Sequence, residues 1–546
     1  MKKYIIYIAM GCMLSLGACT KSDFEDAYAQ SSTLNASTVE KQFAGTLTSN
    51  LAYTMYRYEN YFITLQNTCL PWTQAVGVIN TNGRYVPGEA AISGRWQNYY
   101  NFLAQYKDLL RLYGTLSAEE QAQKKIYVIA ATIFYYDQSQ KQVDLHGDIP
   151  WSEAGLLSTH NGDYKGSYAK YDDGAEIYTK MLDDLKAYSD ELSSMSIEPA
   201  VATVLNSQDF INNGDITLWQ KYCNSLRLRM LMRVSGSSSF ASRASQEISD
   251  ILANPAKYPL VLVNDDNQLI RVNNLNNVSI GGANTVVAGI NNGTDVGINA
   301  SFYRGLFGWG GGDVPSKKMI DLMNTAHDPR LRVMFQPGDS TAGKYVGLDP
   351  TLGQTAQENL YNDAKVSRYN YSTLTYNINV PGMLINAAEV NFLLSEYYLK
   401  AGNNQKAKST YEAGIDQSIA YYYWLRSISN DHTSGNVAQP TSAEISSYKS
   451  SAAVSWDQAA SQADKLALIA TQKWINYSVL EPIESWSEQR RLHLPELSFL
   501  PDNSNALQKT PPSRWVYPSN ESTYNTANYE AVKAKDNLTT KLFWEQ

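Results

Sequence analysis

Apolar and aromatic residues recur at intervals of three and four over most of the chain, and this spacing constrains the fold more than any other feature. One such series is Trp96, Tyr99, Leu103, Tyr106, Leu110 and Tyr113. Residues spaced in this way lie on one face of an α-helix, and Gly114 is expected to end that helix. Ser117 and Glu120 then have the spacing of a capping box, which predicts a second helix directly afterwards. The two helices together predict a helical hairpin.

Further helices are expected on both sides of this hairpin. Most of residues 36–255 has helical spacing, including 174–193 and 216–234, and Ser37 with Glu40 has capping-box spacing near its start. Helix is expected to return at Met383, and the later helices are predicted over residues 384–400, 405–424, 464–480 and 484–491. The hairpins have roughly the size of tetratricopeptide (TPR) repeats, about 34 residues, but no strict tandem repeat is present. The sequence therefore predicts degenerate TPR-like hairpins, followed from Ser498 by a tail wrapped on the surface.

Residues 256–380 have a different character. Ten of the chain's 33 glycines lie between Gly281 and Gly312, together with several asparagines, and glycines at that density break helices and favour turns. The same stretch holds Phe302, Tyr303, Phe307 and Trp309, which is more apolar surface than a pure linker carries. We therefore predict a mainly α protein with an irregular Gly/Asn-rich insert that contains short strands. Residues 36–546 would form one domain, divided into an N-terminal helical part (36–255), the insert (256–380) and C-terminal TPR-like helices with a tail (381–546).

The first 18 residues have the character of a targeting segment. Lys2 and Lys3 precede an apolar run, residues 4–16, that is too short to span a bilayer comfortably. The four residues Leu16-Gly17-Ala18-Cys19, which begin at the last residue of this run, resemble the lipobox of a bacterial lipoprotein. This resemblance implies that Cys19 is acylated and becomes the mature N-terminus. Residues 19–35 would then be a tether, and its acidic start resembles the surface-export signal of some Gram-negative lipoproteins. The alternatives are an ordinary signal peptide with a chance cysteine, or a buried N-terminal helix.

Composition argues against two classes of function. The net charge is −8, so the chain lacks the basic surface expected of a nucleic-acid-binding protein. Only 5 histidines stand against 39 tyrosines, so no metal site and no cofactor are expected.

Cys69 and Cys223 remain once Cys12 and Cys19 are set aside. One disulfide between them is possible, although an apolar helical setting favours a buried free thiol for Cys223.

No motif predicts catalysis. The metalloprotease, redox and phosphate-loop signatures H-E-x-x-H, C-x-x-C and G-x-x-x-x-G-K-[ST] are absent, and residues 338–343 miss the G-x-S-x-G elbow by one position. Glu389 and Glu396 lie seven residues apart on one predicted helix face and could serve as the acid and base of a glycosidase. The simpler interpretation is that both are solvated or salt-bridged, so no catalytic residue is assigned and the protein is not expected to be an enzyme.

Aromatic residues on loops are the remaining chemical resource. A sugar ring presents C–H patches that stack on aromatic faces, and its hydroxyls need amide and carboxylate partners. Trp72 follows Pro71 in a predicted loop, and Trp309 lies between Gly308 and Gly310, so both are candidates for exposed platforms. With Tyr303 and Phe307 they form the predicted ligand-contacting set; packing of these loops onto the body is the alternative.

Several segments, taken together and in order, resemble the SusD/RagB-like family of nutrient-binding outer-membrane lipoproteins, in its SusD-like subgroup. They are Asp144-Leu145-His146-Gly147-Asp148-Ile149-Pro150-Trp151-Ser152-Glu153-Ala154, Gly214-Asp215-Ile216 with Trp219, Asn224-Ser225-Leu226-Arg227-Leu228-Arg229, Asp328-Pro329-Arg330, Ala388-Glu389 with Glu396, and Gln472-Lys473-Trp474 followed by Glu484-Ser485-Trp486 and Arg490-Arg491. Ser395 replaces the alanine that is usual before the second glutamate. The resemblance spans most of the chain.

The resemblance implies an α-helical fold of degenerate TPR units and a role in nutrient capture. The lipoprotein would face the extracellular side of the outer membrane, bind an oligosaccharide, and act as the lid of a SusC-like TonB-dependent transporter. The alternatives are the same role with a peptide ligand, a surface hydrolase, or a purely structural TPR adaptor. Family motifs such as the one containing Asp148 and Pro150 are expected to be structural, with the aspartate capping a helix. The resemblance assigns no ligand-binding residue to this sequence, so the candidates Trp72, Tyr303, Phe307 and Trp309 are inferred only from their residue types and positions. Whether calcium assists ligand binding stays open.

Overall fold

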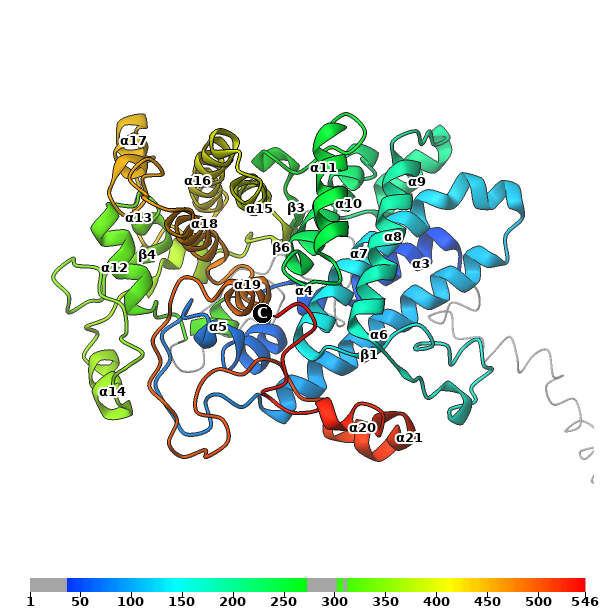
Figure 1. The fold of residues 1–546 in the computed structure, drawn as a ribbon, viewed down its shortest axis with the longest axis horizontal. Helices are drawn as coiled ribbons and strands as arrows, with labels where there is room; N and C mark the ends of the chain where they lie inside the picture. The colour runs from blue at the N-terminus through cyan, green and yellow to red at the C-terminus, as the bar shows by residue number, and fades with distance from the viewer. Residues whose placement is uncertain (1–36, 273–301, 308–311, 546) are drawn as a thin grey trace, which may run out of the picture.

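The computed structural model describes residues 37–272, 302–307 and 312–545, with the side chains of Arg304 and Phe307 left out. The targeting segment, Cys19 and the whole tether lie outside the described residues. The described chain is mainly helical, as the spacing predicts, and its strands form three two-stranded ladders. Figure 1 shows the helices arranged in a row, from α3 and α6 at one end to α12 and α17 at the other, with α10, α15, α18 and α19 between them.

The N-terminal helices follow the predicted pattern closely. They are α3 (Val39–Ser49), α6 (Glu89–Gly114), α7 (Ala118–His146), α8 (Gly174–Leu192), α9 (Pro199–Gln208), α10 (Ile216–Val234) and α11 (Ala241–Ala253). The capping box of Ser117 and Glu120 is confirmed at the start of α7. The one expected at Ser37 is wrong by one residue, because the hydroxyl of Thr38 accepts from the N–H of Lys41 and leaves Glu40 one position too early in the first turn.

The C-terminal helices are also present, with one shifted start. They are α15 (Ala387–Lys400), α16 (Asn404–Ser427), α17 (Ser442–Ser450), α18 (Gln462–Tyr477) and α19 (Pro482–Leu492). The apolar residues at which helix was expected to return instead form β6 (Gly382–Ile385), which pairs antiparallel with β3 (Gln268–Ile270). The side chain of Asn386 then accepts from the N–H of Glu389 and begins α15.

The insert contains more regular structure than was predicted. Its short strands include β3, β4 (Phe335–Gln336) and β5 (Arg368–Tyr369), but it also holds the helices α12 (Lys317–Ala326), α13 (Leu331–Met334) and α14 (Gln354–Asn362).

The tail carries α20 (Ser519–Tyr524) and α21 (Thr526–Tyr529) and runs along the lower edge of the molecule in Figure 1. It does more than cover the surface, because Trp515 and Trp544 are fully buried.

Two arginines of α10 sit in the core among carboxylates from three other helices. Arg229 contacts Glu389 of α15 at 2.6 Å and Asp137 of α7 at 3.0 Å. One turn later, Arg233 contacts Glu484 and Glu488 of α19 at 2.5 and 2.9 Å, and Asp144 of α7 at 3.1 Å. These buried ion pairs connect the N-terminal helices to the C-terminal ones.

A second group of buried ion pairs continues this network toward α18. Glu396 is held by Arg491 at 2.7 Å and by Lys473 at 3.4 Å, and both cations also contact Glu488. Burial opposes the ionisation of Glu396, but the charges of Arg491 and Lys473 outweigh it and hold the pKa of Glu396 below its ordinary value. Glu389 and Glu396 are both fully buried in ion pairs, so the salt-bridged interpretation of this pair is confirmed.

The Asp148 motif is structural, as expected. One oxygen of the Asp148 carboxylate accepts from the N–H of Gly174 at 3.0 Å, at the start of α8, and the other contacts Lys535 of the tail at 2.6 Å. The motif also contains β1 (Ile149–Pro150), which pairs with β2 (Tyr171–Asp172). It fixes the chain between α7 and α8.

Replacing Glu481 by Gln should flatten the dependence of stability on pH. Burial raises the pKa of the Glu481 carboxyl to about 8, against about 4.3 in an unfolded chain. Between these two pKa values the folded protein keeps a proton that the unfolded chain releases. The stability that this bound proton contributes is complete below the unfolded pKa and is lost as the pH rises to about 8. The free energy of unfolding falls by about 1.4 kcal/mol per pH unit over this range. Urea unfolding at pH 6 and pH 8 should show that E481Q loses about 2 kcal/mol less than the unmodified protein over this interval.

The matched control is Glu119→Gln, at an exposed glutamate in the first turn of α7. It should keep the pH dependence of the unmodified protein. Equal losses for E481Q and the unmodified protein would show that the carboxyl of Glu481 is ionised in the folded state.

The two described cysteines are separate, buried free thiols. Cys223 lies on α10 and Cys69 begins α5 (Cys69–Trp72). Burial raises the pKa of each thiol to about 12, which makes both unreactive in the folded protein. A protein starting at Ser22, prepared without reductant, should show no thiol reactive with Ellman's reagent when native and two per chain in guanidinium chloride. No reactive thiol after unfolding would instead indicate a disulfide.

Candidate functional site

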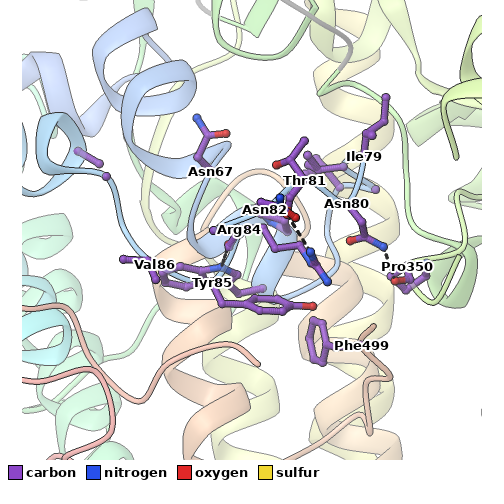
Figure 2. A pocket seen from close by; sticks show the side chains of 18 of the residues that line it. Asn67, Ile79, Asn80, Thr81, Asn82, Arg84, Tyr85, Val86, Pro350 and Phe499 are labelled. Carbon is purple, nitrogen blue, oxygen red and sulfur yellow. Dashed lines mark hydrogen bonds between the residues drawn. The ribbon is translucent and has the colours of Figure 1, made fainter. Parts of the chain in front are cut away.

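A groove of about 470 Å³ lies beside the loop that follows α5. Its lining combines apolar residues with amides, a hydroxyl and one guanidinium, and Figure 2 labels the main ones. The polar lining includes Asn67, Asn80, Thr81, Asn82 and Arg84, and the apolar lining includes Phe62, Ile79, Val86, Pro350 and Phe499. The groove therefore offers hydrogen-bonding groups on an apolar base, which is typical of sites for small molecules.

Side chains from distant parts of the sequence fix this loop. The amide of Asn80 donates to the carbonyl groups of Pro350 and Leu352, both at 2.8 Å, and its backbone N–H donates to Gln357 at 2.6 Å. The guanidinium of Arg84 donates to the carbonyl of Leu500 at 2.8 Å. The loop is thus held from the insert on one side and from the tail on the other, so the groove is largely preformed.

Arg84, Tyr85 and Phe499 lie together at one end of the groove, as Figure 2 shows. The guanidinium of Arg84 lies 4.9 Å from the ring centre of Tyr85, and the Tyr85 ring meets Phe499 edge-on at 6.1 Å. The hydroxyl of Tyr85 donates to the carbonyl of Leu500 at 2.8 Å. Both Nη atoms of Arg84 are engaged with the protein, because the second one donates to the carbonyl of Thr81 at 2.8 Å.

Trp72 lies in the wall of the groove, but it is not an exposed platform. The expectation of a loop is wrong, because Trp72 is the last residue of the helical turn α5, where Pro71 is tolerated within the first turn. The ring is 1% exposed, its indole N–H donates to the carbonyl of Arg84 at 3.1 Å, and it packs against Trp486 at 5.2 Å. Its faces are therefore used for packing; a contact between a ligand and its edge stays a prediction.

A cluster of partly exposed aromatic residues adjoins the groove. It lies on three π-helical turns, η1 (Tyr58–Leu65), η6 (Tyr303–Phe307) and η7 (Tyr371–Thr375), of which η6 packs against both others. The cluster comprises Tyr58 and Phe62 on η1, Tyr303 on η6, Tyr371 on η7, and Tyr376 directly after η7. Phe62 belongs to both features, because it lines the groove and stacks on Tyr58 at 5.1 Å. π-Helical turns occur frequently at functional sites, and here three of them meet.

The close contact between η1 and η6 depends on a glycine. A Cβ added at Gly305 would lie 2.5 Å from the Cβ of Tyr61, so only glycine lets these two turns approach so closely. Beyond them, the ring of Tyr303 lies 5.6 Å from Tyr376, which in turn lies 4.9 Å from Tyr371. The aromatic cluster therefore joins residues from three widely separated parts of the sequence.

A buried ion pair supports the insert side of the cluster. Arg368 contacts Asp313 at 2.7 Å and lies over the ring of Tyr361 at 4.5 Å. Burial, and next the negative charge of Asp313, raise the pKa of Tyr371, so its phenol keeps its proton and can donate a hydrogen bond at neutral pH. The cluster therefore combines partly exposed aromatic rings with neutral phenol groups.

The predicted site residues have different outcomes. Tyr303 belongs to the aromatic cluster; Phe307 is the last residue of η6, but its side chain is not described, and Trp309 lies outside the described residues. The sequence did not single out the other four aromatics of the cluster or the polar lining of the groove. A usable signal for the lining was the Asn-Thr-Asn-Gly-Arg-Tyr run at residues 80–85, in which turn-forming residues precede a cation and an aromatic ring.

Two other properties of the described chain bear on function. In residues 37–272, 302–307 and 312–545, no helix combines the length and the apolar character that crossing a bilayer requires. Within these ranges, no group of three or more histidine, cysteine, aspartate or glutamate side chains could hold a metal ion. The groove and the aromatic cluster bring aromatic rings and hydrogen-bonding groups together, and this combination is suited to binding a small molecule.

Comparison with known proteins gives a consistent result. The profile of a SusD-like family, described as starch-binding and associating with the outer membrane, matches residues 33–518. One similar solved structure is a SusD-like protein labelled Bacteroidetes AC2a, with 18% identity and a TM-score of 0.72 over 93% of this chain and 100% of that chain. A SusD homologue from Parabacteroides distasonis has 20% identity and a TM-score of 0.71 over 93% of this chain and 98% of that chain. A chitin-binding protein has 21% identity and a TM-score of 0.65 over 92% of this chain and 99% of that chain. At these identities the likeness shows the fold, and no curated protein sequence matches the chain.

Proposed function

The chain belongs to the SusD-like family described as starch-binding and associating with the outer membrane, and from this premise we propose that it is a glycan-capturing lipoprotein of the cell surface. It binds an oligosaccharide at the groove and the aromatic cluster. It then passes the ligand to a SusC-like TonB-dependent transporter, on which it acts as a lid. Acylation of Cys19 holds it on the extracellular side of the outer membrane, and the TPR-like helices face the transporter.

The observation that carries this proposal is the meeting of three π-helical turns beside the groove. Five partly exposed aromatic side chains gather there, and the adjoining lining supplies the exposed amides of Asn67 and Asn82 and the hydroxyl of Thr81. Aromatic faces stack on the C–H faces of sugar rings, and amides and hydroxyls bond sugar hydroxyls. The same chemistry needs no catalytic residue, so we propose binding without turnover.

The solved relatives support the class of ligand. One of the similar structures is of a chitin-binding protein, so the fold accommodates a glycan in at least one case. The family description names starch, which is a different glycan. We therefore propose the class, an oligosaccharide, and leave its sugar and linkage to a binding screen.

Removing one ring of the aromatic cluster should weaken glycan binding. The protein starting at Ser22 would first be screened against oligosaccharide and peptide panels, and hits would be measured by calorimetry. Tyr303→Ala and Tyr376→Ala should each raise the Kd for a glycan hit about tenfold, since tenfold corresponds to about 1.4 kcal/mol and a stacked ring contributes about that much.

Tyr524→Ala is the matched control, because it removes an exposed tyrosine on α20 that lines a different pocket. Its Kd should equal that of the unmodified protein. A peptide hit without a glycan hit would transfer the proposal to a peptide ligand, and release of shorter products from any polymer would contradict binding without turnover. If both panels are silent, co-purification with the transporter tests whether the site is completed only in the complex.

A further inference from the structure

A small polar cavity lies on the side of η1 that faces the core. It has a volume of about 30 Å³ and lies between α4 (Leu51–Thr54), η1, α6 and the start of α19. Its polar lining is formed by Tyr53, Thr54, Tyr56, Asn60, Tyr61, Arg95, Lys141 and Glu481. None of these residues lines the groove, so the cavity is separate from the proposed glycan site.

Arg95 is a buried cation without an ionic partner. Its side chain is on α6 and the residue is 5% exposed, and none of the described residues places a carboxylate within 4.0 Å of it. Among the described residues, its Nε and one Nη find no hydrogen-bond acceptor, and the ring of Tyr53 at 5.6 Å gives only partial compensation. Burying an unpaired charge is strongly unfavourable, so a guanidinium in this position needs a counter-charge.

The start of α19 points at the same cavity and is uncapped. Glu481 is the N-cap residue but its side chain makes no capping bond, and Pro482 at the first position has no N–H. In the described part of the chain, nothing accepts a hydrogen bond from the N–H of Ile483 or Glu484, and Pro482 and Ile483 both line the cavity. Free N–H groups and the helix dipole make such an end positive and favourable for an anion.

Lys141 adds a second cation to the lining. Its Nζ lies 3.4 Å from Glu481 and 3.6 Å from Asp137, both longer than a tight charge-assisted hydrogen bond. Because the pKa of Glu481 is raised to about 8 by burial, this carboxyl is largely protonated at neutral pH and does not balance Arg95. The remaining polar side chains of the lining are neutral, namely the amide of Asn60 and the hydroxyls of Tyr53, Thr54, Tyr56 and Tyr61, which leaves the cavity with an excess of positive charge.

We propose that this cavity binds one small monovalent inorganic anion, such as chloride, between Arg95, Lys141 and the N-terminus of α19. A volume of about 30 Å³ accommodates one or two particles of the size of water, since a cavity of about 10–15 Å³ already holds one water molecule. The anion neutralises the buried guanidinium and connects α6 to α19. This inference is independent of the identity of the nutrient.

Bromide locates such a site directly, because it replaces chloride and scatters anomalously. Crystals of the unmodified protein grown with sodium bromide in place of chloride should show an anomalous peak within hydrogen-bond distance of the Arg95 guanidinium. Ordered water there, without an anomalous peak, would overturn the proposal. This measurement needs no variant and so does not depend on whether a variant folds.

Unfolding experiments give a second, independent test. Raising chloride from 10 to 500 mM, with gluconate keeping the ionic strength constant, should raise the Tm of the unmodified protein by about 2 °C, because an anion that binds only the folded state stabilises it. Arg95→Gln should abolish this rise. The matched control is Arg332→Gln, which removes a partly exposed arginine paired with Glu444 on the surface and should keep it. A rise of equal size in R95Q would contradict an anion at Arg95.

Discussion

The fold depends on the buried charges that surround α10. Arg229 and Arg233 lie one turn apart, and their carboxylate partners come from α7, α15 and α19. Desolvating so many ions costs several kcal/mol each, and only close, fully bonded geometry offsets that cost. Any shift of one helix along another would leave a charge unpaired in the core. We therefore attribute to this network the register of the four helices more than their net stability.

The network also positions the groove, through the opposite face of α19. Glu484, Glu488 and Arg491 of this helix enter the ion pairs, whereas Trp486 packs on Trp72 in the wall of the groove. The guanidinium of Arg490 lies 3.6 Å over the ring of Trp486 and fixes its plane. The wall therefore stands on a helix whose position the buried charges determine, while the loop and the π-helical turns in front of it belong to irregular segments. Such a division lets the ligand-contacting residues vary without disturbing the frame.

The sequence predicted local structure well and long-range pairing poorly, for physical reasons that particular residues illustrate. The series from Trp96 to Tyr113 fixes a helix because the spacing and its meaning are both local. The apolar residues of β6 suit a strand as well as a helix, and only the partner strand, more than 110 residues earlier, decides between them. Glu389 and Glu396 were correctly placed on one helix, but Arg491 lies 95 residues beyond Glu396, so the spacing alone did not name the counter-charge.

The candidate site shows the same limit more strongly. Its loop is fixed by contacts between Asn80 and Pro350, 270 residues apart, and between Arg84 and Leu500, 416 residues apart, and no periodicity signals either of them. Trp72 looked like a platform because proline marks a break in the sequence, yet proline is compatible with the first turn of a helix. Tyr303 stands out in the sequence because an aromatic residue in a glycine-rich segment needs a reason to be there. The remaining tyrosines of the cluster had no such contrast, because in a chain with 39 tyrosines an aromatic residue on a helical turn is the ordinary case. What distinguishes them is that three separate turns meet, and that is a property of the folded chain.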